Sequence, residues 1–380
     1  MSIQINFHSL CIILAVGSLS TTSLLLFSLK KMCNRQANGA LGLFLILLGA
    51  SYVSDILYEN HFFEWMPHLY DYDGFLTLLL GPLLYFYILL QTRPDFSFRP
   101  VHLLHLSSLV LYLLIQWDFF TSDASAKVAF IKDDNRMHIP NQFLAHYYKI
   151  GQVLLYEIMC YCLLARHRRT VKELLSSVEN RQLQWLRNLL LASAGLFLIW
   201  VLCNQIAFSY NFQTPVYLSV VALLFFTYWI AYYAVTQEYV FEGISTVTVM
   251  PIIRDEARVR YRNSTLTEDD IKRLMLQTEQ HMRQSKPYLD SNLTLITLAD
   301  QLQFNPKHLS QILNEGFGGN FYKYVNGYRV EESKHLLRDS LHKYNILGVA
   351  YQAGFKSKST FNKAFREFTG CSPSEFAKDV

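Results

Sequence analysis

Two stretches of the chain share a pattern that decides the fold of its last quarter: LADQLQF at residues 298–304 and VAYQAGF at residues 349–355. Ala299 recurs 51 positions later as Ala350, and the phenylalanine that closes each stretch keeps the same separation. After one inserted residue the correspondence continues at a separation of 52, in the pairs Leu309 and Phe361, Leu313 and Phe365, Gly318 and Gly370, and Tyr324 and Phe376. The repeat predicts two copies of one short helical unit.

Each copy carries the signals of two helices joined by a tight turn. In the first copy, apolar residues repeat every three or four positions and so share one side of a helix: Leu295, Leu298, Ala299 and Leu302. Asn305 followed by Pro306 then predicts a cap and the start of a second helix. In the second copy Gly354 closes the first helix and Ser357 caps the next. A helix, a turn and a capped helix form the arrangement that lays its second helix in the major groove of DNA.

The residues in and between the two copies resemble a known family of DNA-binding domains. The runs that carry the resemblance are Leu298-Ala299, Leu309-Ser310, Gly318 to Phe321, Tyr328 to Leu337, Ala353 to Phe355, Ser359 to Phe361, Phe365, and Gly370 to Pro373. They resemble the AraC/XylS (arabinose-regulator) DNA-binding domain, with one departure at Ala377, where many members carry a basic residue. The resemblance implies an all-helical domain over residues 286–380 with two helix-turn-helix units, and it implies promoter DNA and RNA polymerase as partners.

The family pattern also implies which side chains face DNA. In the first unit these are Lys307, Ser310 and Gln311, with His308 beside them, and in the second they are Lys358, Ser359, Asn362, Lys363 and Arg366. Gln311 and Asn362 suit adenine edges, whereas Lys363 suits guanine or phosphate, as does Lys307. About half of the set is expected to touch only phosphate or water.

A helix over residues 320–337 is expected to join the two units. Eighteen residues at 1.5 Å each span roughly 27 Å. The second helices of the units are then expected to enter successive major grooves on one face of DNA.

Seven apolar runs occupy the first 240 residues. They cover residues 7–29, 37–58, 74–91, 101–117, 143–165, 189–210 and 215–237. A bilayer requires about 20 apolar residues per spanning helix. One such run also fits a buried helix of a soluble protein, but seven runs with alternating basic connections favour a membrane domain. The predicted fold is therefore all-α, a seven-transmembrane helix bundle over residues 1–240 followed by the all-helical domain, and the first run is interpreted as a retained span because it lacks a convincing cleavage pattern.

The connections between the runs indicate the orientation. Basic residues follow the first, third and fifth runs: Lys30, Lys31 and Arg35, then Arg93 and Arg99, then Arg166, Arg168, Arg169, Lys172, Arg181 and Arg187. The alternate connections are acidic, mixed or uncharged. Because lysine and arginine near span ends stay on the cytoplasmic side, the amino terminus is expected outside and the carboxyl-terminal domain in the cytoplasm. We therefore expect a multi-pass protein of a bacterial inner membrane.

Ionisable residues inside the runs are candidates for sensing a small-molecule or lipid ligand, because such residues are costly at membrane depth. The candidates are Asp55, His146, Lys149 and Glu157. Solvation at the headgroup level is the alternative for Asp55 and His146. For Glu157 the alternative is a pair with Lys149 or with a tyrosine of another span.

Residues 241–285 are expected to connect the two domains. A basic cluster there, Arg254, Arg258, Arg260 and Arg262, fits contact with anionic lipid or DNA. Thr267 then begins a helix with Glu268, Asp269 and Asp270 in its first turn. Its apolar stripe fits either a homodimer contact or packing on the first helical unit, and the sequence leaves both open.

Charge and cysteine usage narrow the function. The net charge of +4 lies in the tail, since residues 1–259 hold 17 basic and 17 acidic side chains and residues 260–380 hold 17 and 13. The six cysteines show no paired spacing, so no disulfide framework or metal site is expected. No cofactor motif and no catalytic constellation is visible, and a non-enzymatic, membrane-embedded transcription regulator is the favoured interpretation.

Two alternatives remain at this stage. One is a transporter or enzyme whose tail only tethers or autoregulates it, with His146 and Glu157 as the best candidates for a catalytic acid–base pair. The other is release of the tail by proteolysis in the connector.

Overall fold

The computed structural model describes residues 6–28, 35–93, 96–133, 139–175, 181–210, 214–236, 266–339 and 345–378. Within these ranges the chain is helical and forms no β-strand. It divides into two compact units. Unit 1 comprises Met1–Leu164 with Gln184–Ile244, and unit 2 comprises Ala165–Leu183 with Ser245–Val380.

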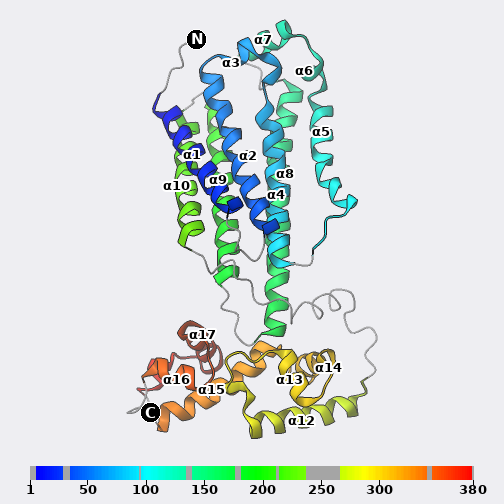
Figure 1. The fold of residues 1–380 in the computed structure, drawn as a ribbon, viewed down its shortest axis with the longest axis vertical. Helices are drawn as coiled ribbons and strands as arrows, with labels where there is room; N and C mark the ends of the chain where they lie inside the picture. Colours follow the sequence, from blue (N-terminus) through cyan, green and yellow to red (C-terminus); the bar gives the residue numbers. More distant parts are fainter. Residues whose placement is uncertain are drawn as a thin grey trace. The chain divides into compact units, whose positions relative to one another are not determined.

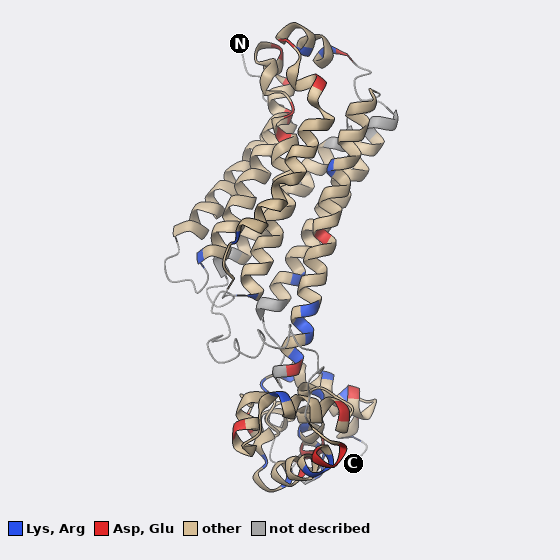
Figure 2. Ribbon diagram, turned by 90° about the vertical axis from the view of Figure 1, so that its right-hand side faces the viewer, with Lys and Arg blue, Asp and Glu red and all other residues tan. Residues whose placement is uncertain are grey.

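Unit 1 is built from long helices that run side by side (Figure 1). These are α1 (Phe7–Ser28), α2 (Arg35–Glu59), α4 (Tyr72–Thr92), α8 (Pro140–Leu174), α9 (Arg181–Tyr210) and α10 (Thr214–Thr236). The end of α8, from residue 165, and the start of α9, up to residue 183, belong to unit 2. Helix α2 packs between α1 and α4, and α1 also contacts α10. Charged residues are sparse along these helices (Figure 2), as expected of elements that are apolar on most sides.

Five described helices are long and apolar enough to cross a bilayer. They are Phe7–Ser28, Arg35–Glu59, Pro67–Thr92, Pro140–Glu173 and Gln184–Ile206. Two further apolar helical segments, Pro100–Ile115 and Tyr217–Tyr233, are shorter. All seven predicted runs are therefore helical, but a count of seven spans stays a prediction.

The fourth predicted run is not one continuous α-helix. A 3₁₀-helix, η2 (Pro100–Leu106), precedes α5 (Ser107–Ile115), and the chain turns at Gln116. At the start of η2 the ring Nδ1 of His102 accepts a hydrogen bond from the backbone amide of Arg99 at 2.8 Å. The apolar composition predicts an α-helix here and does not distinguish it from the tighter 3₁₀-helix that the structure shows.

Short helices connect the long ones at one end of unit 1. They are α3 (Phe62–Trp65), η1 (Pro67–Leu69), α6 (Trp117–Thr121) and α7 (Ala124–Lys132). Aromatic contacts hold them together, including Phe63 with Tyr70 at 5.5 Å and Phe119 with Phe130 at 5.0 Å between ring centroids.

Unit 2 contains two helix pairs on one long helix. The first pair is α13 (Leu295–Leu302) and α14 (Pro306–Gln311), and the second is α16 (Ile346–Gln352) and α17 (Lys358–Thr369). Helix α15 (Phe321–Asp339) joins them, and its 19 residues span about 28 Å. The remaining elements are α12 (Glu268–Ser285), η4 (Pro287–Leu289), η5 (Ile312–Gly316) and α18 (Pro373–Phe376).

Each helix pair has its own apolar core, and α15 contributes to both. Phe321 and Val325 of α15 pack into the core of the first pair, which includes Leu298 and Leu309. Val330 and Leu337 pack into the core of the second pair, around Phe361 and Phe365 and their neighbours. The helix therefore serves both units of the repeat predicted from the sequence.

Helix α12 begins as predicted at Thr267, whose side chain accepts from the amide of Asp270 while the Asp270 carboxylate accepts from the amide of Thr267. Thr278 and Met282 are buried, and Met282 belongs to the core of the first helix pair. Of the two roles left open by the sequence, the structure shows packing on the first pair. The basic cluster at residues 254–262 lies outside the described residues.

Candidate nucleic-acid interface

The first helix pair is capped as its sequence predicts. The side chain of Thr294 accepts from the amide of Thr297 at the start of α13, and Gln303 ends this helix in the left-handed region, with φ 58°. Asn305 caps α14 by accepting from the amide of Lys307 at 2.9 Å, with Pro306 in the first helical position. These caps fix a turn of only three residues between the two helices.

The second helix of this pair is short, and it continues into a π-helical turn. Helix α14 has six residues, and η5 widens the backbone from Ile312 to Gly316. Gly316 packs on α12, where an added Cβ would lie 3.1 Å from the Cε atom of Met275. The absence of a side chain at Gly316 thus makes room for Met275 against the widened turn.

Two residues that were expected to face outward are buried beside the π-helical turn. Ser310 and Gln311 are 4% and 6% exposed. The Nε2 atom of Gln311 donates to Oε2 of Glu315 at 2.9 Å, and Asn314 donates to the backbone carbonyl of Ser310 at 2.9 Å. The prediction that Ser310 and Gln311 face outward is wrong for this structure because both are buried, while their part in DNA binding stays a prediction. Lys307 is exposed and His308 is half-buried.

The second helix pair presents a longer and more polar face. Helix α17 has 12 residues, and its buried side carries Thr360, Phe361, Ala364 and Phe365. The residues expected to face DNA are all exposed: Lys358, Ser359, Asn362, Lys363 and Arg366. Ser357 caps the helix by accepting from the amide of Thr360, and Gly370 ends it with φ 81°. Three of the five exposed residues are basic, which suits phosphate and guanine contacts.

Three further exposed polar residues adjoin the second helices of the two pairs and are not among the predicted DNA-facing residues. Lys356 lies in the turn before α17, and Asn314 and Glu315 lie in the π-helical turn. Lys356 adjoins the Ser357 cap, so the turn signal at Ser357 could have identified it. Nothing in the periodicity distinguishes a π-helical turn from an α-helical one, so Asn314 and Glu315 carried no such signal.

Both helix pairs meet at η4 through a buried arginine. Arg329 of α15 is fully buried, and it donates from Nε to the carbonyl of Tyr288 at 2.7 Å and from Nη2 to the carbonyl of Asp290 at 2.8 Å. Its guanidinium lies 5.9 Å from the ring of Phe355 in the second pair. Burial lowers the pKa of Arg329 to about 10, so the group stays protonated at neutral pH. Arg329 therefore ties α15 and the second pair to the segment that enters the first.

A glycine completes this junction from the second pair. Gly354 has φ 85°, and an added Cβ would lie 2.8 Å from Cα of Leu289 and would also clash with the carbonyl of Tyr288. Glu332 of α15 anchors η4 further, because its carboxylate accepts from the Tyr288 hydroxyl and from Nζ of Lys286, each at 3.0 Å. The hydrogen-bonded η4 segment thus sets where α16 ends relative to α15.

The four residues proposed for sensing do not gather in one place in unit 1. Lys149 lies 3.6 Å from the Asp71 carboxylate, which also accepts from the Tyr112 hydroxyl at 2.6 Å. Lys149 is thus paired with Asp71, and the expected alternative of a Glu157–Lys149 pair is not what the structure shows. Glu157 lines a cavity of unit 1.

The other two sensing candidates occupy separate positions. The His146 ring lies 6.3 Å from the ring of Trp200, which lines the same cavity as Glu157. Asp55 lies on α2 and is not among the residues that line that cavity. In the part of the chain that the structure describes, no cluster of three or more His, Cys, Asp or Glu side chains is arranged to hold a metal ion.

Comparison with known proteins identifies a domain at the carboxyl-terminal end of the chain. Residues 298–379 match the family model described as "Helix-turn-helix domain". An HTH-type transcriptional regulator of Staphylococcus aureus strain COL is 26% identical over 132 residues, which cover 34% of this chain and 16% of that protein. The regulator YtdP of Bacillus subtilis is 29% identical over 87 residues, covering 23% of this chain and 11% of YtdP.

Two further proteins match a similar share of the chain. The Msm operon regulatory protein of Streptococcus mutans is 28% identical over 90 residues, covering 24% of this chain and 32% of that protein. A solved structure, the carboxyl-terminal domain of the response regulator AraT from Geobacillus stearothermophilus, is 24% identical with a TM-score of 0.24 and covers 31% of this chain and 89% of its own. Each of these curated relatives is matched over less than a third of its own length. Residues 298–379 of this chain are an AraC-type helix-turn-helix domain.

Proposed function

We propose that the chain is a membrane-embedded, sequence-specific regulator of transcription that binds promoter DNA through both helix pairs of unit 2. The exposed basic face of α17 carries this proposal, because it supplies phosphate and base-edge donors on a helix of 12 residues behind a capped turn. Relatives named as transcriptional regulators support the same role for this domain. RNA polymerase is the partner that such a role requires at a promoter.

Two observations support the membrane part of the proposal. Five described helices reach the length and apolarity of a span, and they carry exposed Leu24 and Leu191 among other large apolar residues. Apolar surface of this kind fits lipid and not water. The basic residues after the first, third and fifth predicted runs favour a cytoplasmic carboxyl terminus. We propose seven spans in a bacterial inner membrane with the amino terminus outside.

Two experiments test the proposal. Mapping of genomic sites bound by the tagged full-length protein should yield a small set of promoters, with protected regions of about two helical turns if both helix pairs engage. A reporter that functions only in the cytoplasm should be active when it is fused after Val380. Uniform binding along the chromosome, or a periplasmic carboxyl terminus, would contradict it.

We propose that unit 1 acts on unit 2 through conformation or dimer geometry. A ligand of unit 1 shifts such a system only by its difference in affinity for two states. We propose that unit 1 binds that ligand.

A further inference from the structure

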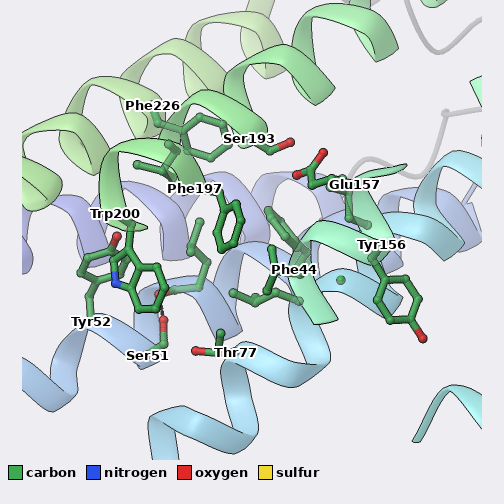
Figure 3. Close-up of a pocket in the computed structure, with 16 residues that line it drawn as sticks. Phe44, Ser51, Tyr52, Thr77, Tyr156, Glu157, Ser193, Phe197, Trp200 and Phe226 are labelled. Atoms are coloured by element: carbon green, nitrogen blue, oxygen red, sulfur yellow. Dashed lines mark hydrogen bonds between the residues drawn. The ribbon is translucent and has the colours of Figure 1, made fainter. Parts of the chain in front are cut away.

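Unit 1 contains a cavity of about 100 Å³ between α2, α4, α8, α9 and α10. Figure 3 shows side chains from these helices converging on it. At α4 and α8 the walls pack closely, since an added Cβ on Gly81 would lie 2.8 Å from atoms of Tyr156. Comparable cavities in other proteins hold a small aromatic molecule or several waters.

Six of the sixteen residues that line the cavity are aromatic. They are Phe44, Tyr52, Tyr156, Phe197, Trp200 and Phe226. The rings of Phe197 and Trp200 are stacked, with centroids 6.1 Å apart, and the hydroxyl of Tyr156 points away from the cavity to Nδ1 of His105 at 2.7 Å. The phenolic oxygen of Tyr156 is therefore engaged outside the cavity. Aromatic faces attract cations through the negative charge of the ring face.

Among the described residues that line the cavity, one carries a carboxyl group, Glu157. Ser193 lies beside it, and the Ser193 hydroxyl donates to the carbonyl of Leu190 at 3.1 Å. Lysine, arginine and histidine are absent from the cavity wall as the structure describes it. Lys149 on the same helix is eight residues away, about 12 Å along the axis, and is paired with Asp71.

We infer that this cavity binds an organic cation, a protonated amine or quaternary ammonium on a small apolar body. The aromatic wall and the acid favour positive charge together, whereas an anion would find no basic partner in the wall. A purely apolar occupant, such as a lipid chain, would gain nothing from a carboxyl group that is costly at this depth. The inference rests on the proposed function in so far as unit 1 is the sensing part, and it names the class of ligand.

A series of three probes of similar size tests the inference. Full-length protein in lipid nanodiscs at neutral pH is titrated by calorimetry with 2-phenylethylamine, 2-phenylethanol and phenylacetate, which are cationic, neutral and anionic. We expect the amine to bind at least about tenfold more tightly than the alcohol, a difference of 1.4 kcal/mol, and we expect no binding of phenylacetate. Equal affinity of amine and alcohol, or absence of amine binding, would overturn the inference.

Variants assign the preference to the cavity. Glu157→Gln should lower the affinity for the amine to that for the alcohol and leave the alcohol within about twofold. Trp200→Leu should weaken the amine more than the alcohol, because indole is the best ring for cations. The matched control is Glu59→Gln on α2, outside the cavity, where Glu59 accepts from Asn6, His8 and Ser9. Amine selectivity that survives Glu157→Gln, or that is lost equally in Glu59→Gln, would contradict the proposal.

DNA binding by the same nanodisc preparation separates this inference from the proposed function. Amine binding without promoter binding would leave the cavity assignment intact and remove the regulatory role. Promoter binding without amine binding would support the regulatory role and overturn the cavity assignment.

Discussion

The two helix pairs of unit 2 come from one sequence pattern but differ at equivalent positions. At the separation of 52, Ser310 and Gln311 of the first pair correspond to Asn362 and Lys363 of the second. The former two are buried and the latter two are exposed. The difference arises after the turn, where the first pair continues into a π-helical turn against α12 and the second continues as a regular α-helix. The repeat in the sequence therefore predicts which positions lie in the core better than it predicts which positions are exposed.

The turns that follow the first helix of each pair also differ in their surroundings. Gln303 and Gly354 are equivalent at the separation of 51, and both have positive φ, 58° and 85°. Gly354 faces a neighbouring backbone, that of η4, whereas Gln303 is exposed. The second turn is thus constrained by its surroundings as well as by its own conformation.

The largest effect is expected at Gly354. Gly354→Ala adds a Cβ against the backbone of η4, which cannot move without breaking its bonds to Arg329, and we expect a loss of about 3 kcal/mol or more. Hydrogen exchange of the full-length protein should show loss of protection in α16 and α17. Gly318→Ala is the control, because Gly318 also has positive φ, 66°, but open space around it. Equal losses in both variants would refute the role of η4.

Arg329 should show the next largest effect. Arg329→Met leaves the carbonyls of Tyr288 and Asp290 without this donor, so we expect the unit to lose about 2 to 4 kcal/mol. The variant should also accept a wider range of distances between the two halves of the operator, because both helix pairs are tied through Arg329. Selection from DNA libraries with variable spacing measures this. An unchanged spacing preference would show that α15 alone orients the pairs.

A smaller effect separates Lys363 from its equivalent Gln311. Lys363→Ala should relax base preference by about 1 to 3 kcal/mol at one position of the operator while weakening binding to random DNA less. Gln311→Ala should leave base preference unchanged, because the Gln311 amide is engaged by Glu315. Binding to operator and scrambled duplexes at fixed salt gives both quantities. An equal loss on all sequences for Lys363→Ala would indicate a phosphate contact instead.

The smallest effect is expected at Gln303. Gln303→Gly relieves the left-handed conformation of a residue with a side chain, and we expect a gain of about 0.5 to 1 kcal/mol in the stability of unit 2. Chemical unfolding followed in unit 2 tests this. A loss of stability would mean that the Gln303 side chain contributes more than its backbone conformation costs.

The helices of unit 2 could be predicted from the sequence because their boundaries are local signals. Thr267, Asn305 and Ser357 cap the helices that they were expected to cap, and Gly354 and Gly370 have positive φ where a helix ends. These interactions span three or four residues, so they are visible in the chain itself.

The rest depends on contacts between distant residues. The pair of Lys149 with Asp71 joins positions 78 apart, and no spacing rule predicts it. The burial of Gln311 follows from a π-helical turn, which shares its apolar pattern with an α-helix. Glu157 is a candidate from the sequence because a carboxyl group is costly in a membrane span. The aromatic side chains around it come from helices that are far apart in the sequence and that only the folded structure brings together.

The most direct test of the account is genome-wide mapping of DNA bound by the full-length protein in its membrane, comparing the native chain with a variant in which Asn362, Lys363 and Arg366 are all replaced by alanine. The account predicts a few promoter sites in the native chain, each about two helical turns long, and their loss in the variant with the protein still in the membrane fraction. Sites that persist in the variant, or a native chain that enriches no promoter, would contradict it.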